Sequence, residues 1–424
     1  MKKVKIAIIG YGDRGSIYAN YSIVEPSSCE VVAVVDPSKE RLILAKKVLS
    51  LKDNQLFEDL DSFLNANINA DLIVNATMDQ DHYEVLKKVL PISKYCLTEK
   101  PIVNNKKQLL ELKRIADKSG TTVFVGHVLR YTPFYKRIKK EILDDKIGEI
   151  VSMELAEHVC SQHYSGSYAR GRWRSEKECG STFLLAKSCH DADLLCWLND
   201  KTKPTSVSSF GGRYFFIPKN APRGATKFCY KCPHQDTCIY SATVLYGKKD
   251  CSPEITHTKY HKEKITLKDR LEFIKHDIFG QCIFTIEGND LVDRQTLIVN
   301  YDNGSVATFT LTAGATKPNR TVFIIGTKGE LQGDIDSGKI ILRQNNADSD
   351  KAKTTIIDVN KEITTEKIIQ GHNGGDFEIS KSIVDYINGD RKSISLTKFE
   401  DSINGHLLVY AADESRTKKR IVNI

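Results

Sequence analysis

The glycine-rich segment near the start of the chain constrains the fold more than any other feature. The apolar run Val4–Ile9 predicts a short strand that leads directly into Gly10, Gly12 and Gly15, spaced G-x-G-x-x-G. In a dinucleotide-binding turn, the first glycine permits the tight turn and the second lets a pyrophosphate approach the backbone. The third lets the following helix, predicted over Ser16–Tyr21, pack against the strand. The N-terminal amides and the positive dipole end of that helix favour phosphate charge.

A second predicted strand, Glu30–Val35, ends at Asp36, which lies 21 residues beyond Gly15. A carboxylate at this place typically binds a ribose hydroxyl and repels the 2′-phosphate of NADP, so NAD is the expected cofactor. Lys39 and Arg14 lie close enough in sequence to keep NADP as an alternative. A structural turn followed by an exposed aspartate would explain the glycines alone, but it would not explain the whole strand–helix–strand context.

Strand and helix alternate up to residue 126, which predicts a doubly wound parallel sheet. Because 424 residues are too many for one ordinary core, we expect an NAD(P)-binding Rossmann domain at 1–126 and a second α/β domain at 127–424. The predicted strands of the first domain are 4–9, 30–35, 71–76, 94–98 and 121–125, and its predicted helices are 39–49, 82–90 and 106–119.

The second region has a different secondary-structure pattern. A bridging helix is predicted over Tyr131–Asp144, and from Gly148 onward β-rich segments, among them residues 281–288, are separated by turn signals. Successive hairpins of this kind predict a mostly antiparallel sheet. A polar, cysteine-bearing insertion covers about 218–270, and helices are predicted again at 376–388 and 397–415.

Charge and hydropathy exclude two classes of partner. The net charge of +8 is spread along the chain and interleaved with acids, so solvated faces explain it better than a nucleic-acid site. No apolar run approaches the roughly 18 residues of a transmembrane helix, and no signal cleavage site follows the first strand. We therefore expect a cytoplasmic protein with neither nucleic-acid nor membrane partners.

The tripeptide Glu99-Lys100-Pro101 follows a predicted strand of the first domain. The carboxyl ends of strands in such sheets point into the ligand crevice, where a lysine can hydrogen-bond a substrate oxygen and favour its alkoxide. A surface lysine before a proline turn is an equally weighted alternative at this point.

With these motifs the chain resembles the Gfo/Idh/MocA oxidoreductases, which include glucose–fructose oxidoreductase and inositol dehydrogenase. The resemblance implies an N-terminal Rossmann domain and a C-terminal α/β domain with a large, mostly antiparallel open sheet. It further implies NAD(P)-dependent oxidation or reduction of a sugar or polyol, and a homodimer or homotetramer. It rests on GYGDRG, Asp36, His82, EKP at 99–101, GHVLRYTPFY at 126–135, IGE at 147–149 and the helix with His190.

The resemblance also suggests site residues. Lys100 resembles the family's substrate-contacting lysine beside the nicotinamide. The expected cofactor-binding residues are Gly10, Gly12, Asp13, Arg14, Gly15, Asp36, Thr77, His82, Glu99, Lys100, Arg172 and Trp173. The expected substrate residues are Lys100, His127, Arg130, Tyr131, Lys187, His190 and Asp191.

A helix predicted from Phe183 carries Lys187, His190 and Asp191 on one face, at spacings i, i+3 and i+4. His190 matches the family's proton-transferring histidine, and an imidazole with an ordinary pKa of about 6.5 can accept a hydroxyl proton as hydride leaves the carbon. Many family members carry an aspartate four residues earlier, where this chain has Ala186. Lys187, expected to be catalytic, either contacts substrate or pairs with Asp191.

The segment 167–174 places three arginines among aromatic residues, ahead of that helix. An arginine offers a planar fork to a cofactor phosphate or a substrate carboxylate, and ordinary salt bridges are an equal alternative for one or two of them. Two later stretches, 288–293 and 371–376, mix glycine with Asn and Asp. This composition favours turns, and sugar-binding loops are the second interpretation.

The insertion holds Cys229-x2-Cys232-x5-Cys238, a spacing typical of tetrahedral zinc ligands. A structural zinc would order so polar a loop. Cys282 is the expected fourth ligand by resemblance to a subgroup, with Cys251, His234 and His257 as rivals, and free thiols as the alternative.

Two other functions fit the same motifs. One is an NAD-dependent glycosidase that oxidises its substrate transiently, and the other is a non-catalytic sugar- or cofactor-sensing protein. Retention of Lys100 and His190 argues against the sensor, whereas Ala186 mildly favours it.

Overall fold

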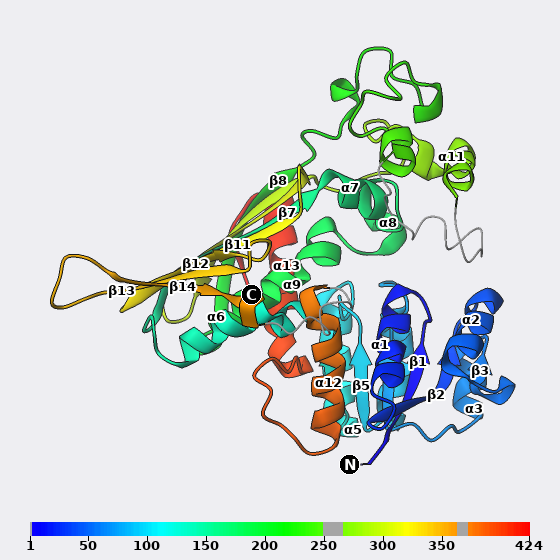
Figure 1. Cartoon of the computed structure of the whole chain (residues 1–424), viewed down its shortest axis with the longest axis horizontal. Helices are drawn as coiled ribbons and strands as arrows, with labels where there is room; N and C mark the ends of the chain where they lie inside the picture. Colours follow the sequence, from blue (N-terminus) through cyan, green and yellow to red (C-terminus); the bar gives the residue numbers. More distant parts are fainter. Residues whose placement is uncertain (1, 249–265, 363–371) are drawn as a thin grey trace.

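The computed structural model describes residues 2–248, 266–362 and 372–424, and these form two sheets with their covering helices (Figure 1). Two of the rival metal ligands, Cys251 and His257, lie outside the described residues. Within the described ranges, no helix is both long enough and apolar enough to span a bilayer.

The first sheet is the predicted doubly wound one, with six parallel strands in the order β3-β2-β1-β4-β5-β6. In this order the strand sequence reverses between β1 and β4. Sheets of this type bind ligands in the crevice at such a switch point, outside the carboxyl ends of the strands. The strands are β1 (Val4–Ile9), β2 (Cys29–Val35), β3 (Leu56–Phe57), β4 (Leu72–Asn75), β5 (Tyr95–Thr98) and β6 (Thr122–Val125). The helices are α1 (Asp13–Val24), α2 (Lys39–Leu49), α3 (Leu60–Asn65), α4 (His82–Val89) and α5 (Lys106–Ser119).

The second sheet has nine strands in the order β14-β13-β12-β11-β7-β10-β9-β8-β15. It is mostly antiparallel as predicted, but its central strands β7 and β10 run parallel. Its strands are β7 (Ile150–Cys160), β8 (Pro204–Gly212), β9 (Arg294–Tyr301), β10 (Val306–Ala315), β11 (Asn319–Gly326), β12 (Gly329–Asp334), β13 (Lys339–Gln344), β14 (Lys353–Asp358) and β15 (Val422–Asn423). Helices of this half are α6 (Pro133–Leu143), α7 (Ser161–His163), α8 (Glu176–Cys179), α9 (Phe183–Leu198), α11 (Leu267–His276), α12 (Gly375–Ile387) and α13 (Phe399–Lys418).

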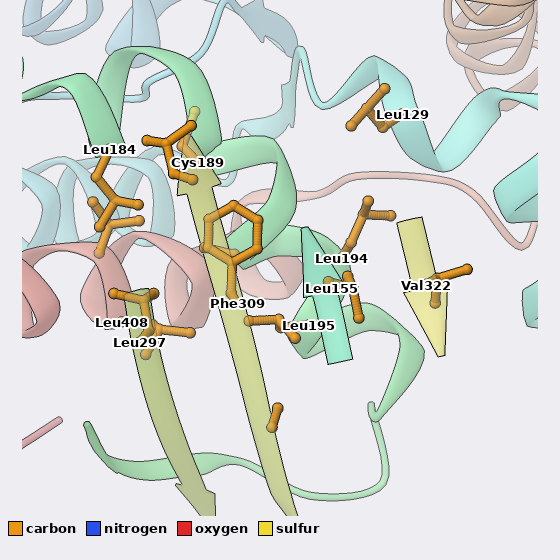
Figure 2. Close-up of a cluster of buried hydrophobic side chains, with 14 of the residues drawn as sticks. Leu129, Leu155, Leu184, Cys189, Leu194, Leu195, Leu297, Phe309, Val322 and Leu408 are labelled. Carbon is orange, nitrogen blue, oxygen red and sulfur yellow. The ribbon is translucent and has the colours of Figure 1, made fainter. Parts of the chain in front are cut away.

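One face of the nine-stranded sheet forms the larger core. Side chains alternate strictly along β9, so Leu297 and Val299 point inward while their neighbours face out. Helices α9 and α13 cover this face, and Leu195 and Leu408 pack with Leu297 there (Figure 2). Each fully buried leucine contributes about 1.5–3 kcal/mol relative to exposure, so this layer fixes where α9 lies.

Residues 281–288 differ from the prediction of a strand. They form turns, and only Gln281 joins a bridge, with Phe228. Ile283 and Phe284 are buried in the larger core without entering a ladder. The apolar run therefore marks a buried loop, which hydrophobic content alone does not distinguish from a short strand.

The C-terminal helices return to the first sheet. Helix α12 lies beside α1 (Figure 1), and Phe377, Ile383 and Val384 share a core with residues of β1 and β2. The backbone N–H of Val125 donates to the carbonyl of Thr397 at 2.8 Å. The two ends of the chain thus build one unit around the dinucleotide-binding turn.

Candidate active site

The glycine turn has the geometry that a bound pyrophosphate requires. Gly10 has a φ of +88°, and a Cβ there would lie 2.5 Å from the carbonyl oxygen of Ala76. A Cβ on Gly15 would lie 1.9 Å from the carbonyl oxygen of Gly10, so α1 packs closely only with glycine there. At Gly12 the nearest atom is 3.9 Å away, and this residue precedes α1 without a side-chain cap. The first amides of α1 are therefore available to an anion.

Asp36 lies at the end of β2 beside this turn, and its side chain is only 1% exposed. Its carboxylate accepts hydrogen bonds from the backbone N–H of Tyr11 at 2.8 Å and of Ser38 at 2.9 Å. The Arg41 guanidinium, which no motif singled out, lies 3.4 Å from the Asp36 carboxylate. Lys39 instead pairs with Glu58 on the surface.

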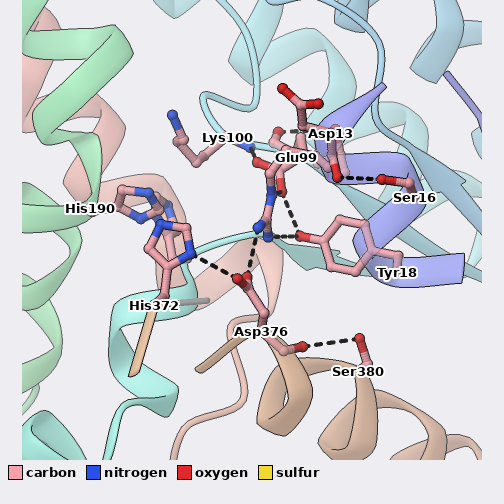
Figure 3. A network of polar contacts seen from close by, with 12 residues as sticks. Asp13, Ser16, Tyr18, Glu99, Lys100, His190, His372, Asp376 and Ser380 are labelled. Atoms are coloured by element: carbon pink, nitrogen blue, oxygen red, sulfur yellow. Dashed lines mark hydrogen bonds and ion pairs between the residues drawn. The ribbon is translucent and has the colours of Figure 1, made fainter. Parts of the chain in front are cut away.

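Arg14 belongs to a buried ionic network rather than to an open phosphate site. Its guanidinium donates to Glu99 at 2.6 Å and to Asp376 at 2.6 Å, and Tyr18 donates its hydroxyl to Glu99 (Figure 3). Burial alone would raise the pKa of Glu99, but the Arg14 charge brings it below its ordinary value. His372 holds the other oxygen of Asp376 at 2.9 Å. The network ties the glycine turn to EKP and to α12, whereas Asp13 remains exposed at the start of α1.

The loop after β4 meets the arginine-rich loop of the second domain. Asp79 accepts hydrogen bonds from Trp173 Nε1 at 3.0 Å and from Ser181 Oγ at 2.7 Å. Arg172 Nη1 lies 3.7 Å from Met78 Sδ. Arg172 and Trp173, predicted to contact cofactor, are therefore brought to the edge of the first sheet where the crevice opens.

His82 connects two loops of this edge. It is fully buried, with Nδ1 2.7 Å from the carbonyl oxygen of Pro101 and Nε2 3.1 Å from that of Thr77. Thr77 itself donates its hydroxyl to Asn75 at 2.7 Å. His82 thus connects the loop after β4 to the loop that carries EKP.

Lys100 and His190 come together from different domains. Lys100 Nζ donates to the backbone carbonyl of Ala186 at 2.9 Å, one turn of α9 before His190. The carbonyl of Ala186 thus contacts the lysine at the position where the resembling family carries an aspartate. Figure 3 shows Lys100, His190 and His372 as neighbours. Burial first, and then the positive charge of Lys100, hold the pKa of His190 well below its ordinary value, so this imidazole is neutral at pH 7 and able to accept a proton.

His127, Arg130 and Tyr131 were expected to touch substrate, but all three are sealed inside the protein. Arg130 forms a two-pronged ion pair with Asp193 of α9, at 2.6 and 2.5 Å. The Tyr131 hydroxyl lies 3.3 Å from that of Thr397, and His127 Nδ1 lies 3.5 Å from His190 Nδ1. The three residues contact α9 and the segment before α13, and their contact with substrate stays a prediction.

Lys187 pairs with Glu157 at 3.3 Å, and not with Asp191 as one alternative proposed. Asp191 instead contacts Arg320 Nε at 2.8 Å, and the same nitrogen lies 2.6 Å from Glu157. No sequence motif pointed to Glu157 or Arg320. Glu157 could have been found from the sequence, because it is a charged residue at a position of β7 whose side chains are buried. Arg320 has no such local signal, because it reaches the site only through the pairing of β11 with β7.

The cysteine insertion does not support the predicted zinc site. Cys229 and Cys282 are buried and lie on neighbouring segments joined by the bridge between Phe228 and Gln281, while Cys232 and Cys238 are partly exposed. Among the residues that the structure describes, no three His, Cys, Asp or Glu side chains are gathered in a way that could hold a metal ion.

Comparison with known proteins agrees with this geometry. Residues 4–127 match the family model described as the oxidoreductase family with an NAD-binding Rossmann fold (Gfo/Idh/MocA). Residues 139–424 match the model for the C-terminal alpha/beta domain of the same family.

Individual relatives are more distant. The putative oxidoreductase YteT of Bacillus subtilis is 25% identical over 309 residues, which is 72% of this chain and 70% of that protein. Inositol 2-dehydrogenase/D-chiro-inositol 3-dehydrogenase of Lactiplantibacillus plantarum is 26% identical over 197 residues, 46% of this chain and 52% of that protein. The WlbA dehydrogenase of Bordetella pertussis, solved with NADH and UDP-GlcNAcA, superposes with a TM-score of 0.68 at 16% identity and covers 100% of this chain and 98% of its own.

Proposed function

The chain belongs to the Gfo/Idh/MocA oxidoreductase family, and from this premise we propose that it transfers hydride between a nicotinamide cofactor and a secondary alcohol or carbonyl of a sugar or polyol. The observation that carries the proposal is the meeting of Lys100 with the His190 turn of α9, at the carboxyl edge of a sheet that holds a dinucleotide-binding turn.

The residues present fit a dinucleotide. When bound, NAD supplies the hydride acceptor, and the chemistry of that ring is its own. The Gly10–Gly15 turn and the uncapped start of α1 would hold the pyrophosphate, and Asp36 would accept from the adenosine ribose. We expect NAD rather than NADP, because the Asp36 carboxylate would lie at the 2′-position and Arg14 is already bound to Glu99 and Asp376. Arg41, 3.4 Å from Asp36, is the residue that would meet a 2′-phosphate if NADP bound instead. Arg172 and Trp173 would close the cofactor side from the second domain.

In this proposal Lys100 and His190 have separate roles at the reacting hydroxyl group of the substrate. The Lys100 ammonium would donate to the reacting oxygen and stabilise its developing negative charge. The neutral imidazole of His190 would take the hydroxyl proton as the carbon loses hydride. His127, behind His190, would keep the ring oriented, because its Nδ1 lies 3.5 Å away in a fully buried environment.

We expect the purified protein to reduce NAD⁺ with at least one member of a panel of sugars, inositols and sugar acids, and Lys100→Met to lower kcat/KM by about 100-fold or more, as loss of a charged hydrogen bond in the transition state does. Absorbance of the reduced nicotinamide measures both. Lys107→Met, an exposed lysine of α5, is the matched control and should change nothing. Equal rates for Lys100→Met and the control would contradict the assigned role.

The same assay separates the two alternatives. Cleavage of a nitrophenyl glycoside without net reduced nicotinamide would identify the glycosidase, since the oxidation is then transient. Sugar-dependent quenching of bound NADH fluorescence with no turnover on any substrate would identify the sensor.

We also propose that the outer face of the nine-stranded sheet mediates homo-oligomer formation. Phe210, Ile298, Val306 and Ile325 are exposed on that face, on four different strands. Apolar side chains gathered in this way mark interaction surfaces. Light scattering is expected to give the mass of a dimer or tetramer, and the substitution Phe210→Lys with Ile298→Lys is expected to reduce it to one chain. A wild-type mass of one chain would contradict the proposal, and Ile239→Lys, exposed outside the sheet, is the control.

A further inference from the structure

Three nitrogen-bearing side chains of the second domain gather next to the reaction centre. His163 ends α7, immediately after β7, Lys187 lies one turn before His190 on α9, and Arg320 lies at the start of β11. The mechanism proposed above uses none of them. The Lys187 and Arg320 side chains are each 13% exposed, and His163 is exposed, so all three remain in reach of a ligand.

Arg320 has unused hydrogen-bonding capacity. Its Nε contacts both Glu157 and Asp191, at 2.6 and 2.8 Å. The terminal nitrogens Nη1 and Nη2 have no hydrogen-bond partner in the part of the chain that the structure describes. Two parallel N–H donors on one planar group are the geometry that binds a carboxylate in a bidentate way.

The formal charges around this region balance. Lys100, Lys187, Arg320 and Arg14 stand against Glu157, Asp191, Glu99 and Asp376. The case for an anion therefore depends on the free donors of Arg320, and not on an excess of positive charge.

Both imidazoles have a pKa well below the ordinary value. Desolvation by the protein atoms packed around each ring is the main cause, although part of the His163 residue stays exposed, and nearby cations act in the same direction. His163 is therefore neutral at pH 7 and can donate one hydrogen bond.

We propose that Arg320, Lys187 and His163 form a subsite for a single carboxylate of the substrate, so that the preferred substrates are acidic sugars of the uronic or aldonic acid class. This inference rests on the proposed function, because it names the substrate of that same site. Arg320 would bind the carboxylate through its two free nitrogens, with Lys187 as a second charge and His163 as a neutral donor. The planar fork of Arg320 matches the two oxygens of a carboxylate, whereas a phosphate monoester would bring about −1.5 to −2 charges to a region whose formal charges already balance, so a carboxylate fits better.

The test measures binding and needs no turnover. Full-length protein with NADH is titrated calorimetrically with two matched pairs, glucuronate against glucose and gluconate against glucitol. We expect at least one acid to bind about 10- to 100-fold more tightly than its neutral partner, the range for a hydrogen bond to a charged group. Neutral partners that bind equally or better, or an absence of binding by both acids, would overturn the proposal. Tighter binding of glucose 6-phosphate than of both acids would also overturn it.

Variants test the residues. Arg320→Lys keeps the charge but removes the fork, and should reduce the preference for the acid about tenfold or more while leaving NADH affinity unchanged. Arg343→Lys, on β13 of the same sheet and paired with Glu330, is the matched control. Because Arg320 also holds Glu157 and Asp191, the exposed His163→Asn provides a variant with little structural risk, expected to lower the preference several-fold. An unchanged preference in both variants would reject the subsite.

Failure of this inference and failure of the proposed function look different. Acids that bind tightly without ever reducing NAD⁺ would leave the subsite standing and remove the oxidoreductase assignment. Rapid oxidation of neutral sugars, with no preference for acids, would support the oxidoreductase assignment and reject the carboxylate subsite.

Discussion

Replacement of His190 by asparagine is expected to lower kcat by about 10²- to 10⁴-fold, the contribution of a positioned general base. Asparagine keeps the size and polarity of the site, so affinity for NADH should stay within about twofold, because cofactor binding depends on the glycine turn. Steady-state kinetics and NADH fluorescence titration measure the two quantities. His276→Asn, a histidine of α11 whose side chain is 73% exposed, is the control. A kcat within tenfold of the wild type would contradict the role of His190.

The pH dependence gives an independent check on the same residue. A base must be deprotonated to work, and burial together with Lys100 lowers the pKa of His190 well below its ordinary value. In the oxidation direction, kcat should therefore stay high as pH falls through about 6.5, where an ordinary histidine would protonate, and decline only in more acidic solution. Lys100→Met should move that decline to higher pH, because it removes a positive charge beside the imidazole.

Replacement of Arg130 by methionine is expected to lower the free energy of unfolding by about 3–5 kcal/mol, because it leaves a buried carboxylate without its partner. Arg130 is 2% exposed, and both prongs of its guanidinium contact Asp193. Burial raises the pKa of Asp193 even beside Arg130. Urea denaturation followed by circular dichroism measures the loss.

A double variant and a surface control make that measurement specific. Arg130→Met combined with Asp193→Leu should recover much of the lost stability, since no unpaired charge then remains. Lys381→Met removes one member of a surface ion pair on α12 and should cost about 0–1 kcal/mol. A loss below about 1 kcal/mol for Arg130→Met would show that Asp193 is satisfied in another way.

The first domain was largely predictable because its signals are local. The helices predicted at 39–49 and 106–119 are found with the same bounds, since apolar periodicity and Gly120 at a helix end act within a few residues. The G-x-G-x-x-G turn likewise places its own helix. Asp36 follows directly from the position where β2 ends.

The candidate site was predictable only in part. Lys100 and His190 follow from motifs, but the contact between them passes through the backbone of Ala186, which no side-chain pattern encodes. Glu157 and Arg320 are 163 residues apart in sequence and meet because β7 pairs with β11. Pairing between distant strands depends on the register of the whole sheet, so no local pattern at Arg320 indicates its role. Arg130 was placed in the site by its motif, but its burial depends on how α9 packs.

The return of α12 to the first sheet has a consequence for how the protein is made. Phe377 and Val384 complete a core that begins with Ile6 and Ile8. These helix residues leave the ribosome roughly 250 residues after the last strand of that sheet, a delay of about 13–50 s at 5–20 residues per second. During this interval the nascent cofactor domain exposes the apolar surface that α12 later covers. The unit that binds dinucleotide is thus completed only after the whole second sheet apart from β15 has been synthesised, so a chain truncated before α12 should depend on chaperones rather than fold early.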